Sequence, residues 1–427
     1  MKTRTRLKLL KLWKRPGEFT RDYFLKRYPT ADAPTEGKKP KPKAPAVAQA
    51  RQYDMAAFHH LRDPFENRLA IDVVITWVDG ADPQWQARKA KAIHGKRVDS
   101  IANDAARFQS KEELRFCLRS LNAFGTWINH IYIVTDRQTP SWLAPNPKIT
   151  IVDHTEIIPE KYLPTFNSHV IETWLHRIPG LSEHFLYFND DVMLGRPAPP
   201  SHYFGSNGLA YNFITRAETP AGAPALHDTP TLRGAKNVRA LLQREFGVYL
   251  RYNSAHTVFP LRRSTYEAAH DMFADEIADY CHNKVRGHSD LPFASYLIPN
   301  LAFLRGEAVT QRTSCFYFDI RSALAERYYK TLLRRRATDL APFSICLNDV
   351  AVEGEAEGSE ARMRHFMESY FPIRAPWEND ADVGEIPFSP QALAHSEREG
   401  DPIEKVERRA ARKPAGRSGR KTKAGSA

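Results

Sequence analysis

Two short apolar segments of this chain run directly into acidic residues, and this pattern constrains the fold more than any other feature. In one of them, residues 185–188 read as a buried strand and are followed by Asn189, Asp190 and Asp191. Adjacent carboxylates repel each other, so a strand end that keeps two of them is typical of a cation site or an acid–base site. A solvated turn is the simpler alternative, because Asn and Asp are common turn residues.

The other segment, residues 71–78, is rich in β-branched side chains and ends at Asp79 and Gly80. Asp82 and Pro83 then predict the N-cap and the first residue of a helix. A glycine at a strand-to-helix turn lets backbone amides approach a phosphate, and helix N-termini attract anions. One such turn is a weak signal, but two acidic strand ends in one chain favour a site.

Strand-like and helix-like runs alternate over the first half of the chain. The strand-like runs are residues 71–78, 128–135, 149–153 and 184–189, and the helix-like runs are 83–94, 111–123 and 168–178. Ser110 and Glu113 predict a capping box for the second of these helices. The alternation predicts an α/β fold with a mostly parallel sheet and flanking helices. In such open sheets, ligands bind at the carboxyl ends of the strands.

Helix-like patterns dominate after residue 215. They cover residues 230–246, 262–280 and 321–336. Thr229 and Pro230 predict the start of the first of these helices and Gly247 its end. One short strand, residues 343–347, ends at Asn348 and Asp349, which is a third acidic strand end. The sequence therefore predicts a Rossmann-like α/β core followed by a helical C-terminal half.

The net charge of +12 is concentrated at the two ends of the chain. Residues 1–50 carry 14 Lys or Arg and 4 Asp or Glu, and residues 401–427 carry 9 and 3, which leaves −4 for residues 51–400. An acidic body argues against a nucleic-acid groove across the folded domain. Basic tails suit a surface of anionic lipid.

Four segments are predicted from this composition. Residues 1–28 form a basic amphipathic leader, 29–60 a Pro/Lys-rich linker, 61–385 the folded domain, which the family resemblance below makes the catalytic domain, and 386–427 a basic disordered tail. A loosely ordered basic arm is the alternative for the leader. Because the chain has no run of 18 apolar residues, we expect no transmembrane helix. We expect a cytoplasmic protein that is peripherally associated with the inner face of the plasma membrane.

The cysteines are too few and too widely spaced for a disulfide framework or a paired zinc site. Their apolar neighbours predict buried free thiols in a reducing compartment. The four residues are Cys117, Cys281, Cys315 and Cys346.

The motifs, taken in order, resemble a known family. The segments that show this resemblance are residues 71–86 (IDVVITWVDGADPQWQ), 151–204 with its FNDDVML core, 255–264 (AHTVFPLRRS) and 344–349 (SICLND). They are similar to the four ordered regions of the stealth family, which includes bacterial capsule polymerases and the lysosomal-enzyme N-acetylglucosamine-1-phosphotransferase. The resemblance covers roughly residues 71–350 and implies a glycosyltransferase A-like core.

The resemblance implies transfer of a hexose-1-phosphate, such as N-acetylhexosamine 1-phosphate, from a UDP-sugar to a sugar hydroxyl. The bond that breaks is a phosphorus–oxygen bond of the diphosphate, and UMP leaves. Matched to the family motifs, the nucleotide-binding strand end is Thr76, Trp77, Val78, Asp79 and Gly80. The matched catalytic positions are Glu172, Asp191, His256 and Arg286. Ile75 stands where an aromatic residue is usual, and residues 283–290 around Arg286 match only loosely.

The residue types allow this chemistry. Oxygen ligands at strand ends predict a Mg²⁺ or Mn²⁺ site built from Asp190, Asp191 and Asp349, although the sequence leaves open which of them contact the ion. A histidine such as His256 is the residue type best suited to accept the acceptor's proton near neutral pH. Glu172 would orient the histidine or the acceptor, with a solvated helix charge as the alternative.

The remaining candidates concern substrate binding. Arg286 is the first candidate for bidentate contact to phosphate oxygens, and Arg262 and Arg263 are the second candidates. Asn189, which precedes Asp190 and Asp191 at the same strand end, is a further candidate for substrate binding. Trp77 would stack on uracil or sugar, or would belong to the core.

Two other function classes fit the same residues. An ordinary UDP-sugar glycosyltransferase would use the same acidic metal site but would form glycosidic bonds and release UDP. A noncatalytic, membrane-associated polysaccharide-binding protein would keep the fold without turnover. The partners expected for the transferase are a UDP-sugar donor, an oligo- or polysaccharide acceptor and a membrane surface, with no nucleic acid.

Overall fold

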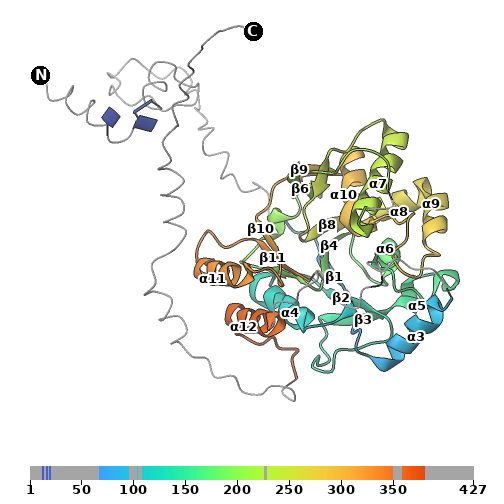
Figure 1. The fold of residues 1–427 in the computed structure, drawn as a ribbon, viewed down its shortest axis with the longest axis horizontal. Coiled ribbons are helices and arrows are strands. Elements are labelled where there is room, and N and C mark those ends of the chain that lie inside the picture. The colour runs from blue at the N-terminus through green and yellow to red at the C-terminus, as the bar shows by residue number, and fades with distance from the viewer. Residues whose placement is uncertain are drawn as a thin grey trace, which may run out of the picture. The chain divides into compact units, whose positions relative to one another are not determined.

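The computed structural model describes residues 67–95, 103, 108–225, 228–349 and 358–379, with a few isolated positions between 12 and 20 (Figure 1). The chain forms two compact units, one of residues 1–141 and 145–377 and the other of residues 142–144 and 378–427. In the smaller unit, the Asn379 N–H donates to the Trp142 carbonyl at 2.8 Å. The predicted leader, linker and tail, and the domain limits at 61 and 385, lie outside the described residues and stay predictions.

A five-stranded sheet with the order β3-β2-β1-β4-β8 forms the centre of the larger unit. Its strands are β1 (Ile71–Thr76), β2 (Ile131–Thr135), β3 (Ile149–Asp153), β4 (His184–Asn189) and β8 (Phe259–Arg262). The first four are parallel, and β8 runs antiparallel to β4. The predicted mostly parallel sheet is therefore confirmed.

Helices cover both faces of this sheet (Figure 1). They are α3 (Pro83–Ile93), α4 (Glu113–Phe124), α5 (His154–Ile157), α6 (Ser168–Thr173), α7 (Pro230–Phe246), α8 (Arg263–Met272), α9 (Ala274–Tyr280), α10 (Ile298–Leu304), α11 (Ala325–Arg335) and α12 (Ser359–Tyr370). Short 3₁₀ turns lie at Glu160–Tyr162, Leu175–Arg177 and Pro200–His202, and a π-helix lies at Phe293–Leu297. Two-sided cover explains why β1 and β4 are apolar on both faces.

The predicted helix ends are mostly confirmed. The Asp82 side chain caps α3 by accepting the Gln84 N–H, Thr229 caps α7, and Gly247 ends α7 with φ 67°. The predicted capping box at Ser110 is wrong. The N-cap of α4 is Glu112 in a left-handed conformation, and Glu113 accepts the N–H of Lys111 instead.

Helices α7–α12 confirm the predicted helical C-terminal half, and strands of two small sheets lie there as well. One has the order β10-β11-β5 and the other β7-β6-β9. Their strands are β5 (Val192–Leu194), β6 (Ala210–Glu218), β7 (Tyr252–Ser254), β9 (Ala308–Gln311), β10 (Cys315–Asp319) and β11 (Ser344–Asn348). The sequence predicts β11 as residues 343–347. The strands β7 and β9 have three and four residues and few buried side chains, so their sequences give too few alternations to identify them.

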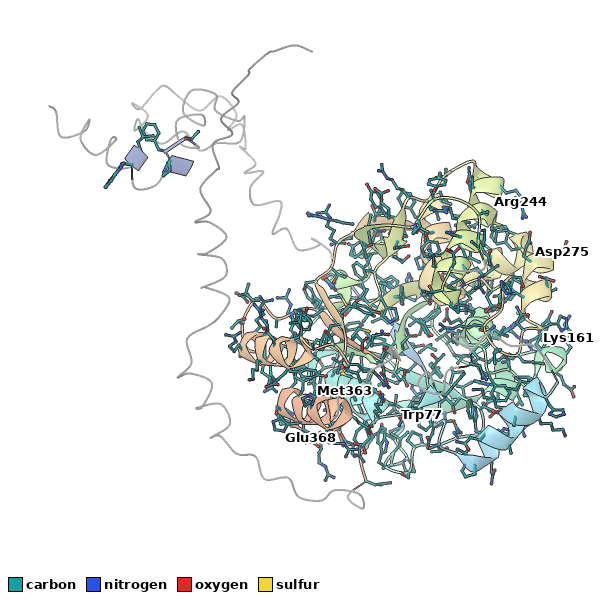
Figure 2. All side chains as sticks on the ribbon, in the orientation of Figure 1. Trp77, Lys161, Arg244, Asp275, Met363 and Glu368 are labelled. Carbon is teal, nitrogen blue, oxygen red and sulfur yellow. The ribbon has the colours of Figure 1, made fainter. Side chains whose placement is uncertain are left out.

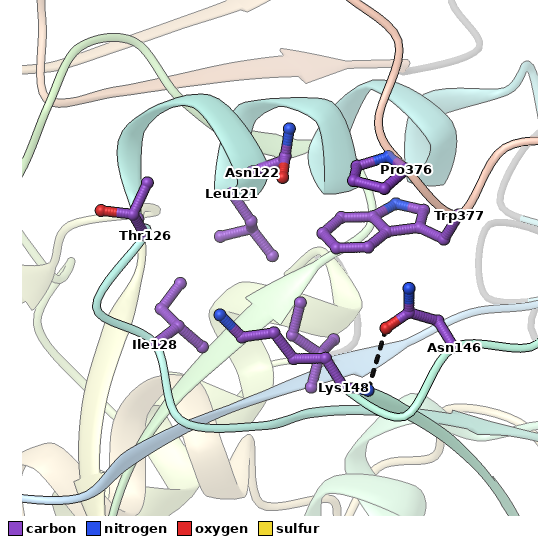
Figure 3. A pocket seen from close by; sticks show the side chains of 10 residues that line it. Leu121, Asn122, Thr126, Ile128, Asn146, Lys148, Pro376 and Trp377 are labelled. Carbon is purple, nitrogen blue, oxygen red and sulfur yellow. Dashed lines mark hydrogen bonds between the residues drawn. The ribbon is translucent and has the colours of Figure 1, made fainter.

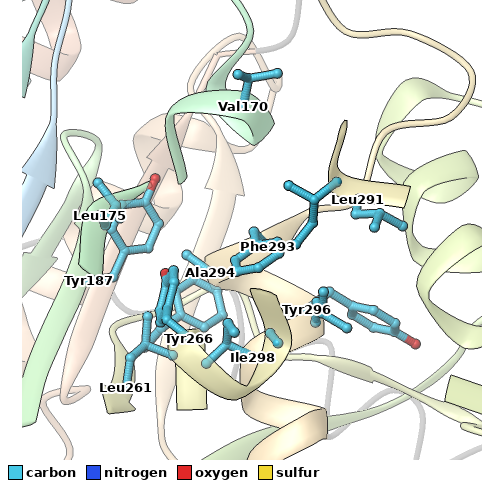
Figure 4. Packing of buried hydrophobic residues seen from close by; sticks show 14 of the residues in the cluster. Val170, Leu175, Tyr187, Leu261, Tyr266, Leu291, Phe293, Ala294, Tyr296 and Ile298 are labelled. Atoms are coloured by element: carbon cyan, nitrogen blue, oxygen red, sulfur yellow. The ribbon is translucent and has the colours of Figure 1, made fainter. Parts of the chain in front are cut away.

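A large core cluster packs α7–α10 and the π-helix against β4 and β8 (Figure 4). Phe185 and Tyr187 of β4 enter this cluster, and Phe259 of β8 and Tyr266 of α8 lie against them. Burial of each such ring contributes roughly 1.5–3 kcal/mol. Charged residues such as Arg244 and Asp275 lie at the outer surface (Figure 2). The strands that lead to the acidic ends are thus rigidly held.

The thiol prediction is confirmed in part. All four cysteines are free, with Cys117, Cys281 and Cys346 buried and Cys315 partly buried. Among the described residues, the helices are too short or too polar to span a bilayer.

Candidate active site

Strand register brings a histidine to the carboxyl end of β4. Thr76 and Asn189 are paired at the ends of β1 and β4. Because β8 runs antiparallel to β4, with Phe259 opposite Tyr187, the chain enters β8 at this same end. His256, three residues before Phe259, therefore lies beside Asn189, with 3.4 Å between Asn189 Nδ2 and His256 Nε2.

A second sheet brings a thiol to the same place. After Asp191 the chain forms β5, in which Val192 lies opposite Cys346 of β11. Cys346 Sγ donates to Asp191 Oδ2 at 3.4 Å. Asp191, His256 and Cys346 each offer one possible metal-ligand atom, and these three atoms lie within 4.8 Å of one another. The other oxygen, Asp191 Oδ1, is buried and has no hydrogen-bond partner.

Three acidic side chains, those of Asp190, Asp191 and Glu113, interact electrostatically near the carboxyl end of β4. Burial, together with the charges of Glu113 and Asp191, raises the pKa of Asp190 well above its usual range. Burial raises the pKa of Asp191, and His256 opposes that rise. Burial also raises the pKa of Glu113 to about 7. Carboxylates gathered in this way bind protons or a cation, and the unpartnered Asp191 Oδ1 fits an oxygen-seeking divalent cation.

The third strand end differs from the prediction. Asp349 follows β11, and both Lys111 Nζ and the Arg321 guanidinium contact its carboxylate. All three side chains are at least 89% buried. Asp349 is therefore neutralised by two cationic groups and is not grouped with Asp191 and His256. No sequence pattern pointed to Lys111 or Arg321, because single basic residues are common at helix starts and in loops.

Arg286 lies near enough to Glu172 for its charge to act on that carboxyl. Glu172 lies on α6, is 4% exposed, and accepts the Ala294 N–H at 3.1 Å. Burial raises the pKa of Glu172, and the charges of His169 and Arg286 oppose that rise. Arg286 Nη2 donates to Ser168 Oγ, at the start of α6, at 2.8 Å.

Asp290 fixes the segment that carries Arg286. This carboxylate is 1% exposed. Its Oδ2 accepts from Asn167 Nδ2 at 2.8 Å and contacts His169 Nδ1 at 3.1 Å, while its Oδ1 accepts from Asn283 Nδ2 at 2.8 Å. Residues 283–290 are thereby attached to the start of α6. The role of Arg286 at the site stays a prediction.

The strand end of β1 is a tight turn. A Cβ on Gly80 would lie 2.3 Å from the Phe108 carbonyl oxygen, which accepts the Gly80 N–H at 2.7 Å, so only glycine fits. The side chain of Gln138 accepts the Asp79 N–H and donates to the Asp79 carbonyl.

Trp77 is 9% exposed and its Nε1–H points to Ser110 Oγ at 3.4 Å, so the structure places this ring in the core (Figure 2). Val78 packs on a small neighbouring cluster.

Arg262 and Arg263 are not brought to this edge. Arg262 is paired with His184, at the amino end of β4, and its Nε donates to Glu183. Arg263 pairs with Glu267 on the exposed face of α8. The antiparallel direction of β8, which the motif did not reveal, separates both arginines from His256.

A cavity of about 280 Å³ lies elsewhere (Figure 3). Trp377, Lys148 and Asn146 line it together with the end of α4. Lys148 and Ile131 stand at the amino ends of β3 and β2, so this cavity is at the opposite edge of the sheet from Asp191.

Three segments match conserved regions of stealth proteins: residues 70–97 match region 1, 107–212 region 2 and 330–384 region 4. The chain is also 40% identical over 372 residues to the capsular polysaccharide phosphotransferase LcbA of Neisseria meningitidis, covering 86% of this chain and 100% of the relative. This chain belongs to the stealth family.

Another stealth relative is the exopolysaccharide phosphotransferase SCO2592 of Streptomyces coelicolor, 39% identical over 313 residues that cover 72% of this chain and 33% of the relative. Among solved structures, the galactosyltransferase LgtC in complex with donor and acceptor sugar analogs is 12% identical, with 71% of this chain and 97% of that chain covered and a TM-score of 0.35.

The matched stealth regions contain much of the site described above. Region 1 contains Gly80, region 2 contains Glu172 and Asp191, and region 4 contains Cys346. His256 lies outside these three ranges, and the register of β8 places it at the site.

Proposed function

We propose that this stealth protein transfers N-acetylhexosamine 1-phosphate from a UDP-sugar to a hydroxyl of an oligo- or polysaccharide acceptor. It would release UMP and build phosphodiester-linked capsular or exopolysaccharide. The names of the relatives support a phosphotransferase of this kind. The observation that carries the proposal is the meeting of Asp191, which has one unpartnered oxygen, with His256 at the carboxyl end of β4.

Asp190 and Asp191 are the residues that would hold a divalent cation, Mg²⁺ or Mn²⁺. When bound, such an ion neutralises charge on a diphosphate and stabilises the leaving nucleotide. Burial raises the pKa of the Cys346 thiol well above its ordinary value, so Cys346 acts as a weak donor to Asp191 and not as a thiolate ligand. Asp349, paired with Lys111 and Arg321, is not available in the same way.

The side chains of the protein have separate roles in the proposed reaction. His256 accepts the proton of the acceptor hydroxyl as that oxygen attacks phosphorus. Arg286 binds oxygens of the transferred phosphate. Glu172 orients the acceptor hydroxyl, and the Gly80 turn receives the nucleotide. The phosphorus–oxygen bond to UMP breaks, and the sugar's anomeric bond stays intact.

Phosphorus NMR of reactions with a panel of UDP-sugars and short acceptors, in the presence of Mg²⁺, tests the proposal. We expect a new phosphodiester resonance and UMP as the nucleotide product, both lost in excess chelator. UDP as the sole nucleotide product would indicate a glycosyltransferase. Donor binding without any turnover would indicate a binding protein, and full activity in chelator would exclude the cation.

We further propose that residues 1–28 hold the enzyme on the inner face of the plasma membrane. This segment carries 10 Lys or Arg against two acidic residues, and each basic residue near an anionic surface contributes roughly 1 kcal/mol. In vesicle flotation, the full chain should bind anionic vesicles more strongly than neutral ones, and deletion of residues 1–28 should release it. Equal flotation of the two forms would reject the role.

A further inference from the structure

Four side chains from three segments form a hydrogen-bonded chain that leads into the site. Thr76 Oγ1, at the end of β1, lies 3.0 Å from Tyr187 Oη. Tyr187 Oη donates to Asn189 Oδ1 at 2.9 Å. Asn189 Nδ2 lies 3.4 Å from His256 Nε2. No motif singled out Tyr187, which reads in the sequence as one more aromatic residue of a buried strand.

The direction of this chain follows from its donors. A tyrosine hydroxyl has one proton, and Tyr187 gives it to Asn189, so Thr76 must be the donor to Tyr187. The Asn189 amide is placed with its oxygen toward Tyr187, and its NH₂ then faces His256. Because an NH₂ group only donates, His256 Nε2 must accept. In this arrangement Nε2 carries no proton, so a neutral His256 has its proton on Nδ1.

The position of the tyrosine hydroxyl is fixed by packing. Tyr187 is fully buried, and its ring lies in the core cluster of Figure 4, with 6.2 Å between its ring centroid and that of Phe259. Burial raises the pKa of the Tyr187 hydroxyl well above its ordinary value, so it stays a donor. A hydroxyl held in this way cannot rotate to another partner without moving the core.

We propose that Tyr187 is a positioning residue for the transfer reaction, because it fixes Asn189 and, through it, keeps His256 Nε2 free of a proton. The inference rests on the proposed role of His256. In the step, the acceptor's O–H proton moves to Nε2, the acceptor oxygen bonds to phosphorus, and the electron pair of the broken phosphorus–oxygen bond leaves with UMP. The 3.4 Å contact is long for a hydrogen bond, so an acceptor hydroxyl displaces the amide readily.

The variant Tyr187→Phe tests this with little change in packing. We expect kcat to fall roughly 10- to 100-fold, as for other losses of positioning, with less than a twofold change in KM for the donor. Tyr203→Phe is the matched control. Its hydroxyl is also buried, and it has no hydrogen-bond partner, so its removal should leave kcat unchanged. Thermal unfolding of both variants shows whether they fold.

A spectroscopic readout separates positioning from stability. Nitrogen NMR of ¹⁵N-histidine-labelled full chain reports which ring nitrogen of each histidine is protonated, and the signals missing in His256→Gln identify His256. We expect an unprotonated Nε2 in the wild type and a mixture of tautomers in Tyr187→Phe. This measurement needs no turnover, so it tests the hydrogen-bonded chain even if the wild type makes no phosphodiester and the proposed function fails.

Three outcomes would overturn the inference. One is unchanged kcat in well-folded Tyr187→Phe. Another is a wild-type spectrum with the proton on His256 Nε2. The third is a loss of kcat in Tyr187→Phe without any change at His256, or with an equal loss in Tyr203→Phe.

Discussion

Replacing Asp191 with Asn is expected to lower kcat by on the order of 10²-fold or more without lowering the melting temperature. In the folded protein this residue is partly buried, its buried Oδ1 has no partner, and burial raises the pKa of the carboxyl. A group of this kind costs folding free energy when it is charged, so a neutral amide of the same shape relieves that cost. The residue would thus be kept for its chemistry at the expense of stability.

Kinetics and thermal unfolding with and without Mg²⁺ check this prediction. The melting temperature of the wild type should rise with Mg²⁺, because a ligand of the folded state stabilises it, and that of Asp191→Asn should rise much less. The exposed Asp275→Asn is the control and should behave as the wild type. A well-folded Asp191→Asn protein with near-normal turnover would remove Asp191 from the mechanism. His256→Ala should show a kinetic loss of similar size.

The sequence predicted the strands that build the site because their signals are local. β1 and β4 carry β-branched or aromatic runs bounded by polar residues, and the structure has them where expected. The pairing of β8 against β4 is not local. His256 and Asn189 are 67 residues apart, and no periodicity in either segment reveals that β8 runs antiparallel. The motif resemblance proposed His256, and the register explains why it reaches the site.

The same non-local register explains the misplaced candidates. Arg262 follows His256 by six residues in the sequence, but β8 carries it to the other end of β4. Asp349 ends β11 as predicted, yet Lys111 and Arg321 reach it from distant segments. Tyr187 was missed for another reason. Its hydroxyl acts only through partners on other strands, which a one-dimensional pattern does not contain.

Replacing Asp290 with Ala is expected to abolish most of the transfer activity and to lower the free energy of unfolding by about 3–5 kcal/mol. Asp290 contacts three side chains on two segments, those of Asn167, His169 and Asn283. Its loss removes a hydrogen-bond partner from the buried Asn167 and His169 and from the partly buried Asn283, at about 1–3 kcal/mol for each buried group. The segment that carries Arg286 then loses its attachment to α6, and the guanidinium loses its place near Glu172.

Urea unfolding and steady-state kinetics test this prediction, with Asp275→Ala as the control. Asp275 is exposed in the first turn of α9, so its loss should change the free energy of unfolding by only about 0.5 kcal/mol. Because Arg286 binds the transferred phosphate in the proposed reaction, the folded fraction of Asp290→Ala should show weaker donor binding as well as slower turnover. Donor affinity and turnover equal to the wild type would show that residues 283–290 keep their position without this carboxylate, and that the hydrogen bonds of Asp290 serve stability alone.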